Sequence, residues 1–232
     1  MAEKEQFEEK LMFLSQIAGE LAHELKNPLS TIGLNIQLLI EDCKEQQESE
    51  KTIKRLDRIK LEVDRLDRLL NDFLKIIRGY KLEPVKIELN HLIEEILIFL
   101  EPEATRKNIR ILPIYSKAKL IVNVDRNQMK QAIINVILNS IQATHSNGDI
   151  FIKIYKREKD AVIEIIDTGC GIKKENLNKI FDPFFTTKEN GTGLGLAATK
   201  RIIEEHAGSI KVFSEQGKGT QFLIFIKSHS GN

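Results

Sequence analysis

A histidine with a carboxylate beside it lies in the middle of a long amphipathic helical pattern. His23 and Glu24 occur in the stretch ELAHELKNPLSTI, residues 20–32. A neutral imidazole nitrogen is a nucleophile near neutral pH, provided that a neighbouring carboxylate removes or holds the other ring proton. The same two residues would also suit a solvated helix surface. The motifs that follow in the chain favour a reacting histidine.

The helix that carries His23 is predicted to pack through a different face. Apolar residues recur at alternating steps of three and four from Phe7 to Leu39, as in a helix that packs against other helices. In this register His23 and Asn27 share a face that points away from the seam. Pro28 lies inside the pattern, and a kink about one turn after His23 is expected because proline removes a backbone hydrogen bond.

A second long helix is predicted after the polar stretch at residues 44–50. Its apolar residues keep a 3.5-residue period over three heptads, from Leu56 to Ile77. A short connection between two long helices favours an antiparallel hairpin, but two helices alone enclose no wide core. We therefore expect two copies of the hairpin to form a dimeric four-helix bundle. A plain coiled-coil spacer would show the same seam.

Gly79 and the pair Glu83-Pro84 end the second helix and mark a domain boundary. This predicts a first domain at residues 1–80 and a second at residues 81–232. In the second, helices are expected at residues 89–107, 125–144 and 195–206, and strands at residues 109–115, 120–124, 150–157, 161–167, 209–214 and 220–227. Such interleaving predicts an α/β sandwich with helices on one face of a mixed sheet. The predicted fold class is α+β multidomain.

Composition limits the classes of function. The 232 residues hold 35 Lys and Arg against 34 Asp and Glu, and this net charge of +1 argues against a nucleic-acid binder that works by bulk electrostatics. Cys43 and Cys170 are far apart and fit a reducing compartment. No apolar run reaches the length of a membrane helix, and the first residues lack the apolar core of a signal peptide. We expect a cytoplasmic chain, or a cytoplasmic piece of a membrane-anchored protein.

A row of neutral amides lies on the helix predicted at residues 125–144, opposite its apolar face. The row consists of Gln128, Gln131, Asn135, Asn139 and Gln142. A solvated helix face is normally rich in Lys and Glu, so the row indicates a surface that avoids fixed charge. Amide oxygens are hard ligands suited to Mg²⁺, which completes its coordination with waters and substrate phosphates. The same side chains could instead form hydrogen bonds across a sheet.

Two glycine-containing motifs follow. The first, DTGCG at residues 167–171, comes directly after a β-branched run, so its carboxylate would lie at a strand end beside glycines that let a flat ligand approach. Alone, this motif could also be a tight turn. The second, GTGLG at residues 191–195, opens a helix, where backbone N–H groups and the helix dipole suit phosphates. Between them FDPFFTTKEN is typical of a lid over a ligand, and Lys188 in it could reach a phosphate or stay in solvent.

In this order HELKNPL, NxxxN, DTGCGI, FDPFF and GTGLGL resemble the boxes of bacterial two-component sensor histidine kinases. The HELKNPL form is similar to that of the nitrogen-regulation and sporulation kinases. The resemblance covers nearly the whole chain. It implies a dimerisation and histidine-phosphotransfer domain, followed by an ATP-binding domain of the fold shared by gyrase, Hsp90, MutL and the histidine kinases.

The resemblance also implies roles for individual residues. His23 would be the phosphoacceptor, Glu24 the base that takes its proton, and Asn27 the residue that orients water when the partner is dephosphorylated. Asn139 would hold Mg²⁺, with Asn135 as a second candidate. The implied ATP-binding residues are Asp167, Gly169 and Gly171 at the adenine, Thr220 at a water-mediated contact, and Lys188, Gly191, Thr192, Gly193, Leu194 and Gly195 at the triphosphate.

The implied activity is ATP-dependent phosphorylation of His23 and transfer of the phosphoryl group to an aspartate of a response-regulator receiver domain. A homodimer would carry it out and would also dephosphorylate the regulator. Asn135 occupies the position where ATP-hydrolysing proteins of this fold resemble one another in carrying glutamate, and an amide cannot act as a general base. ATP hydrolysis without the histidine should therefore be poor. The alternative classes are an ATPase clamp driven by hydrolysis and a dimeric scaffold with a vestigial nucleotide pocket.

Overall fold

The computed structural model of the chain describes residues 21–22, 24–42, 49–77, 82–188 and 191–229. The chain divides into two compact units. The first, the helical unit, is Met1–Gly79 with Thr186–Leu194, and the second, the sandwich unit, is Tyr80–Phe185 with Gly195–Asn232. The predicted division into folding domains 1–80 and 81–232 stays a prediction. Within the described ranges, no helix is both long enough and apolar enough to cross a membrane.

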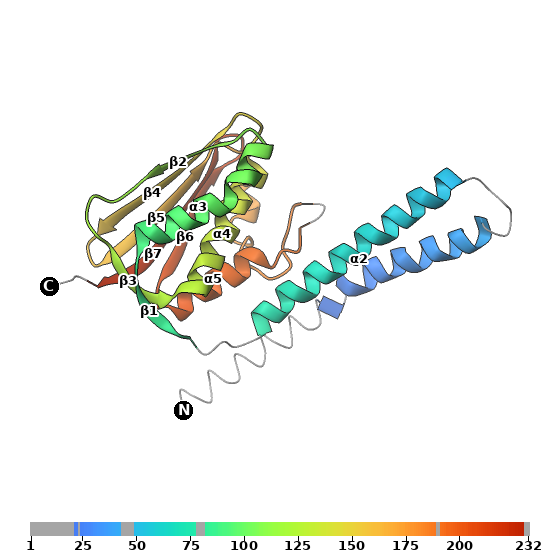
Figure 1. Ribbon diagram of the computed structural model, residues 1–232, viewed down its shortest axis with the longest axis horizontal. Coiled ribbons are helices and arrows are strands. Elements are labelled where there is room, and N and C mark those ends of the chain that lie inside the picture. Colours follow the sequence, from blue (N-terminus) through green and yellow to red (C-terminus); the bar gives the residue numbers. More distant parts are fainter. Residues whose placement is uncertain (1–20, 23, 43–48, 78–81, 189–190, 230–232) are drawn as a thin grey trace, which may run out of the picture. The chain divides into compact units, whose positions relative to one another are not determined.

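The helical unit contains two helices that run side by side in opposite directions (Figure 1). The first is described at residues 21–22 and 24–42 and continues through Pro28, and the second is α2 (Ser49–Ile77). Arg55 and Asp42 form an ion pair of 2.7 Å between them. Buried residues of the first helix recur every seven residues, which places them on one side against α2. They are Leu21, Pro28, Asn35 and Asp42. The predicted antiparallel hairpin is confirmed.

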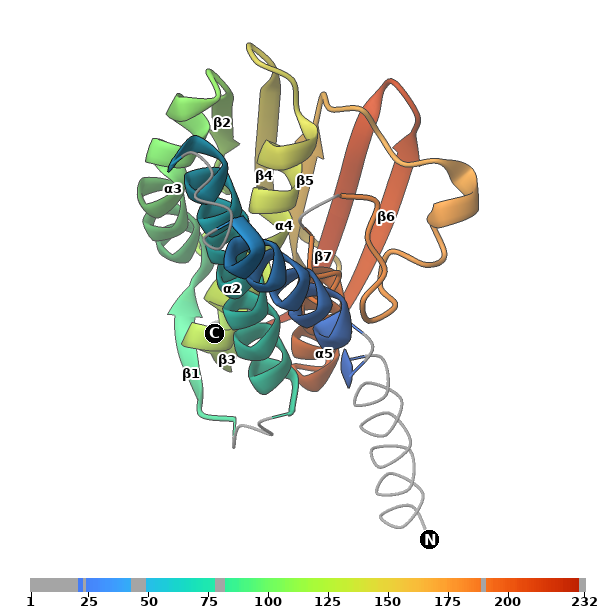
Figure 2. The same ribbon diagram turned by 90° about the vertical axis from the view of Figure 1, so that its right-hand side faces the viewer.

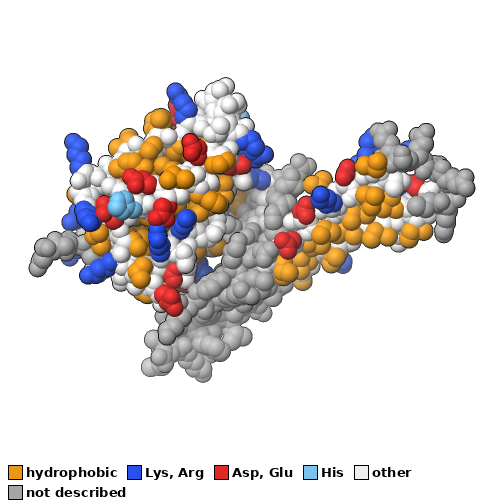
Figure 3. Space-filling model, viewed as in Figure 1, with side chains coloured by type: hydrophobic (Ala, Val, Ile, Leu, Met, Phe, Trp, Pro, Cys, Tyr) orange, Lys and Arg blue, Asp and Glu red, His pale blue; other side chains and the backbone are white. Residues whose placement is uncertain are grey.

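The apolar seam residues predicted for α2 lie on two faces of that helix, one partly buried and one exposed. Ile59 and Leu66 of the predicted seam are partly buried, and Leu69, outside that prediction, is 1% exposed. Leu56, Val63 and Leu70 of the predicted seam are 46–52% exposed and form a second apolar stripe of α2. Exposed hydrophobic side chains follow one another along the hairpin in Figure 3. The hairpin therefore has both an internal seam and an apolar outer face.

The sandwich unit is a mixed sheet of seven strands with three long helices on one face (Figures 1 and 2). The strand order is β1-β3-β7-β5-β4-β2, with β6 also paired to β7, and only the β2–β4 pair is parallel. The strands are β1 (Pro84–Glu88), β2 (Arg110–Ile114), β3 (Ile121–Asp125), β4 (Asp149–Arg157), β5 (Asp160–Asp167), β6 (Ser209–Glu215) and β7 (Gly219–His229). The helices are α3 (Leu89–Arg106), α4 (Arg126–Ala143), α5 (Gly195–Glu205) and a 3₁₀ turn, η1 (Lys174–Asn176). The predicted sandwich is confirmed.

The core lies between the sheet and the helices. The predicted apolar face of α4 is fully buried there, at 0% exposure, and consists of Met129, Ala132, Ile133, Val136, Ile137 and Ile141. Burial of each large aliphatic side chain contributes about 1.5–3 kcal/mol. Along β5 the core side chains are Ala161, Ile163 and Ile165, so every second residue of the strand faces the helices. Asp167 follows in the same alternation.

Asp125 joins three elements near the point where the chain enters the sandwich unit. Its Oδ1 accepts hydrogen bonds from the backbone N–H groups of Asn127 (3.0 Å) and Gln128 (3.1 Å), which caps the start of α4. Its Oδ2 accepts a bond from the N–H of Glu83 at 3.2 Å. The N–H of Asp125 itself donates to Nε2 of His206 at 2.9 Å. These bonds fix the start of α4 against β1 and the end of α5.

Candidate functional site

Asp167 is the last residue of β5, and its side chain is directed to the helical face of the sheet. It is 2% exposed. Its Oδ1 accepts hydrogen bonds from the N–H groups of Gly169 at 3.0 Å and Thr220 at 3.1 Å. Thr220 is also the cross-strand partner of Asp167 in β7. Such donors are needed here because burying a charged group without partners is costly.

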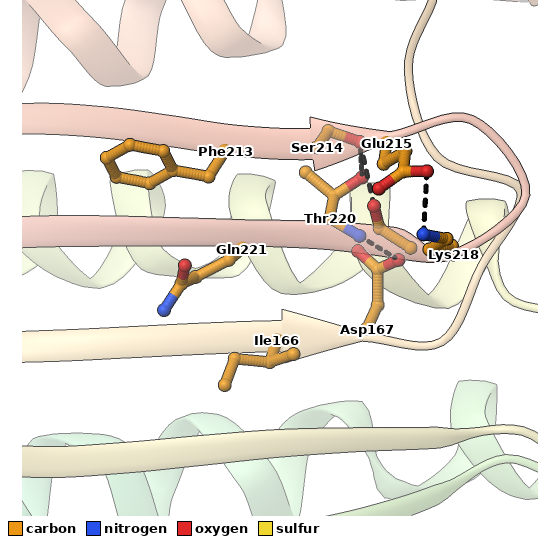
Figure 4. A pocket seen from close by; sticks show the side chains of 9 residues that line it. Ile166, Asp167, Phe213, Ser214, Glu215, Lys218, Thr220 and Gln221 are labelled. Atoms are coloured by element: carbon orange, nitrogen blue, oxygen red, sulfur yellow. Dashed lines mark hydrogen bonds and ion pairs between the residues drawn. The ribbon is translucent and has the colours of Figure 1, made fainter.

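Ser214 on β6 extends this hydrogen-bond network, and no sequence pattern pointed to it. Its Oγ donates to the carbonyl oxygen of Gly219 at 2.8 Å and accepts from the N–H of Ile172 at 2.8 Å. It also lies 3.0 Å from Oγ1 of Thr220 (Figure 4). Ser214 therefore connects the Thr220 side chain to the backbone of Ile172, the residue that directly follows the DTGCG turn.

A shallow pocket of about 360 Å³ lies over the ends of β5, β6 and β7 (Figure 4). Its lining includes Ile166, Phe213 and Gln221, each one residue away from a member of the Asp167 network. Successive side chains of a strand point to opposite faces of a sheet, so these three point away from the helices. The pocket thus opens largely on the sheet face without helices, and Asp167 and Thr220 lie at its inner end.

The glycines of the DTGCG turn have a packing reason. A Cβ atom at Gly169 would lie 2.6 Å from the carbonyl oxygen of Ala143, at the end of α4. One at Gly171 would lie 2.1 Å from the carbonyl oxygen of Glu215, and Gly171 has a φ of +66°. Both contacts are too close for a side chain. Small residues are therefore required here by the protein itself, and the approach of a flat ligand stays a prediction.

Gly195, the first residue of α5, is in a different position. The nearest atom to a Cβ built there is Cγ of Asn135 at 3.9 Å, an ordinary van der Waals contact. No close protein contact among the described residues requires a glycine at this position. Gly195 begins an 11-residue helix, and the backbone N–H groups and dipole at a helix start favour an anion.

Asn135 connects the amide row of α4 to this helix start. Its Nδ2 donates to the carbonyl oxygen of Gly195 at 3.2 Å and to Oγ1 of Thr199 at 3.4 Å. Its Oδ1 accepts a hydrogen bond from Nε2 of Gln131 at 2.9 Å. Asn135 therefore forms hydrogen bonds within α4 and to the neighbouring helix α5, and not across a sheet, which was the alternative to metal binding.

Helix α4 links the two glycine motifs. Near its end the carbonyl oxygen of Ala143 accepts a hydrogen bond from the N–H of Cys170 at 3.1 Å, and about two turns earlier Asn135 contacts Gly195. Asn139 lies between these points, one turn from each. The span from Asn135 to Ala143 is about 12 Å along the helix axis. This is the scale of an extended nucleoside triphosphate.

The other residues predicted to bind phosphates lie in the segment Thr186–Leu194, which belongs to the helical unit. The N–H of Lys188 donates to Oγ1 of Thr186 at 3.1 Å, and the N–H of Gly191 donates to the carbonyl oxygen of Lys188 at 3.2 Å. The segment thus contains a hydrogen-bonded turn around Lys188. The remaining predicted residues of the segment are Thr192, Gly193 and Leu194, and Gly193 has a φ of +67°.

The predicted phosphoacceptor, His23, lies outside the described residues. Its neighbour Glu24 is partly buried on the first helix, and Asn27 is exposed. The carbonyl oxygen of Asn27 accepts a hydrogen bond from Oγ1 of Thr31 at 3.2 Å. The exposure of Asn27 agrees with the heptad register, which placed it away from the seam. The catalytic roles of these residues stay predictions.

The predicted metal ligands of the sandwich unit are side-chain amides of α4. Nowhere in the described part of the chain do three or more His, Cys, Asp or Glu side chains gather in a way that could hold a metal ion. An amide oxygen, water and ligand phosphates together form a donor set that fits Mg²⁺. Asn139 is the amide that lies between the motifs.

Two family models match the chain. The His Kinase A (phospho-acceptor) domain matches residues 13–78, and the histidine kinase-, DNA gyrase B- and HSP90-like ATPase matches residues 124–230. Sporulation kinase C of Bacillus subtilis (strain 168) is 34% identical over 219 residues, which are 94% of this chain and 50% of the relative. The chain thus spans about half the length of that curated relative.

Solved structures of the histidine kinase ThkA are also similar to this chain. The histidine kinase ThkA in complex with the response regulator protein TrrA is 30% identical to this chain, with a TM-score of 0.81. That match covers 98% of this chain and 66% of the ThkA chain. The separate catalytic domain of ThkA is 36% identical with a TM-score of 0.58, over 62% of this chain and 95% of that one. The similarity therefore extends over both units.

Proposed function

Because this chain belongs to the histidine kinase family, we propose that it is an ATP-dependent protein-histidine autokinase that phosphorylates His23. It then passes the phosphoryl group to an aspartate on the receiver domain of a response regulator, and it also dephosphorylates that regulator. The observation that carries the proposal is the arrangement along α4. This helix contacts the DTGCG turn at Ala143 and the start of α5 at Asn135, with Asn139 between them.

The adenine would lie at the DTGCG turn. The carboxylate of Asp167, held by the N–H groups of Gly169 and Thr220, would accept a hydrogen bond from the exocyclic amine. Gly171 would lie beside the ring, and the hydroxyl of Thr220 would contact the base through water. The phosphates would lie beside Gly191, Gly193 and Gly195, where α5 begins, with the Lys188 ammonium as an additional partner.

Asn139 would hold Mg²⁺ through its side-chain oxygen, whereas the oxygen of Asn135, the second residue predicted for this role, already accepts from Gln131. When bound, the cation neutralises charge on the transferring phosphate. The fit rests on the amide oxygens of α4, which are hard ligands. Nucleotide phosphates and water would complete the coordination.

The nucleophile is an imidazole nitrogen of His23. It forms a bond to the γ-phosphorus while the bond between that phosphorus and the oxygen bridging to the β-phosphate breaks, and ADP leaves. Glu24 takes the proton from the imidazolium. In the second step the phosphorus–nitrogen bond breaks as an aspartate carboxylate of the regulator forms a phosphorus–oxygen bond. Asn27 orients water when the regulator is dephosphorylated, and the amide of Asn135 leaves water near ATP without a general base.

A second copy of the chain is the partner proposed for the outer face of the hairpin. Leu56, Val63 and Leu70 on α2 are joined by Leu29 and Ile36 on the first helix, all 45–56% exposed. Two such faces would bury each other in a four-helix bundle. A response regulator is the second partner, by similarity to ThkA, which was solved with TrrA. The proposed use of ATP and of a response regulator supports a cytoplasmic location for the activity.

Incubation with ATP labelled in its γ-phosphate tests the function. The wild-type chain should become labelled, with the acid lability of a phosphohistidine, and His23→Gln should take up none. Equal labelling of His23→Gln would reject the assignment. Turnover of ATP without any phosphoprotein would favour an ATPase clamp instead. Mixed dimers of His23→Gln and Asn139→Ala chains then show whether one subunit phosphorylates its own histidine or that of its partner.

A further inference from the structure

We propose that Asn135 is a positioning residue, which holds the start of α5 at a fixed place relative to Asn139, and that it is not a ligand of Mg²⁺. The inference rests on the proposed binding of ATP. It assigns Asn135 a different role from Asn139, although both belong to the same amide row. The consequence is that the phosphate-binding end of α5 is set by a side chain of α4.

All parts of the Asn135 amide have protein partners. The two N–H bonds of Nδ2 are directed to the carbonyl oxygen of Gly195 at 3.2 Å and to Oγ1 of Thr199 at 3.4 Å. The oxygen accepts from Gln131 at 2.9 Å. A ligand of Mg²⁺ must turn its oxygen to the ion, whereas this oxygen is engaged along α4. The amide orientation that makes these three bonds therefore favours support of Gly195 over metal binding.

Thr199 forms the second connection between α4 and α5. It is 0% exposed, and its Oγ1 lies 2.9 Å from the carbonyl oxygen of Gly195 and 3.4 Å from that of Ala132 on α4. The Gly195 carbonyl is thus approached by one donor from each helix. Since Gly195 is the first residue of α5, these bonds hold the turn whose N–H groups would face the phosphates.

Only an amide can make this set of bonds. A carboxylate at position 135 has no N–H to offer to the Gly195 carbonyl and would place two acceptors against each other. The single residue type thus explains two properties, the lack of a general base beside ATP and the fixed start of α5. Gln131 supports the same orientation because it donates to the Asn135 oxygen.

The test is Asn135→Asp, which keeps the shape of the side chain and removes its donor. Two measurements are made: the affinity for ATP over a series of Mg²⁺ concentrations, and hydrogen–deuterium exchange at residues 195–199 without nucleotide. We expect ATP to bind about tenfold more weakly at saturating Mg²⁺, with faster exchange at residues 195–199. Unchanged exchange together with a lower half-saturating concentration of Mg²⁺ would overturn the inference, because a carboxylate is a good Mg²⁺ ligand.

Thr199 provides a second, milder pair of variants. Thr199→Val removes the hydroxyl and should speed exchange at residues 195–199 in the same way, whereas Thr199→Ser keeps the hydroxyl and should restore the wild-type exchange. Asn127→Asp makes the same chemical change as Asn135→Asp on the exposed first turn of α4 and should alter neither measurement. A wild-type chain that binds no ATP would reject the proposed function. A wild-type chain that binds ATP as tightly as Asn135→Asp, with equal exchange, would reject only the role of Asn135.

Discussion

Asp167 and Thr220 face each other across β5 and β7, and the backbone N–H of Thr220 donates to Oδ1 of Asp167 at 3.1 Å. The donor is a main-chain group, so any residue except proline at position 220 would supply it. The acceptor depends on the side chain at position 167. The N–H of Gly169 reaches the same oxygen at 3.0 Å. The buried carboxylate therefore has a fixed orientation before any ligand binds, which lowers the cost of ordering it on binding.

The first prediction concerns the charge of this carboxylate. Asp167→Asn keeps an oxygen for the two N–H groups but replaces the other oxygen by an NH₂ group, which cannot accept from the adenine amine. We expect ATP and ADP to bind about 10- to 100-fold more weakly. The reason is that the new NH₂ group and the adenine amine would be two buried hydrogen-bond donors that face each other without an acceptor. Titration calorimetry with ATP would measure this. Asp160→Asn, at the other end of β5, should bind normally, and wild-type affinity in Asp167→Asn would contradict the adenine contact.

The second prediction separates two glycines that the sequence presents alike. Gly169→Ala should lose about 1–3 kcal/mol of unfolding free energy, because its Cβ would lie 2.6 Å from the Ala143 carbonyl oxygen. Gly195→Ala should keep or gain stability, by up to about 1 kcal/mol, since alanine favours a helix and the nearest atom is 3.9 Å away. Its affinity for ATP should fall. Urea unfolding and nucleotide titration of both variants check this, and equal destabilisation by the two substitutions would argue against it.

Local patterns predicted the elements of the sandwich unit but not the contacts between them. The apolar face of α4 and the strands beside DTGCG follow from periodicity within one element. The sequence pattern does not predict strand β1, because Glu83-Pro84 indicates a domain boundary there. Strand β1 lies at the edge of the sheet and pairs along its length with β3. A proline at the first residue of a strand is compatible with such an edge position. Short edge strands therefore carry a weak signal in the sequence.

Tertiary hydrogen bonds explain most of the rest. Ser214 contacts Ile172, 42 residues away, and Asp125 contacts His206, 81 residues away, and neither pair shares a local pattern. From the sequence, the amide of Asn135 suits both a metal ligand and a hydrogen bond across a sheet, and its bonds to helix α5 are neither. Its environment beside Gly195 was needed to show this. Similarly, heptad spacing predicted apolar seam positions on α2 but not which of them remain exposed.

The third prediction tests the outer face of the hairpin. Val63 is 49% exposed and lies seven residues from both Leu56 and Leu70, on one stripe of α2. Val63→Lys should dissociate the proposed dimer, because it places a charge in the bundle core. Leu61 is more exposed, at 64%, but lies about 160° away from Val63 around the helix. Leu61→Lys should therefore leave the dimer intact. Analytical ultracentrifugation measures both, and a dimeric Val63→Lys would place the interface elsewhere.

The fourth prediction concerns the start of α4. Asp125→Ala removes the acceptor for the N–H groups of Asn127, Gln128 and Glu83, and should lower the unfolding free energy by about 1–2 kcal/mol. Asp125→Asn keeps a side-chain oxygen that can cap the helix, so it should restore most of this loss. Neither substitution changes a group that would contact ATP, so nucleotide affinity of the folded variants should stay near that of the wild type. Urea unfolding followed by circular dichroism, with a parallel ATP titration, measures both quantities. A large loss of affinity in Asp125→Asn, without loss of stability, would show that the start of α4 acts on the nucleotide site directly rather than through the stability of the helix.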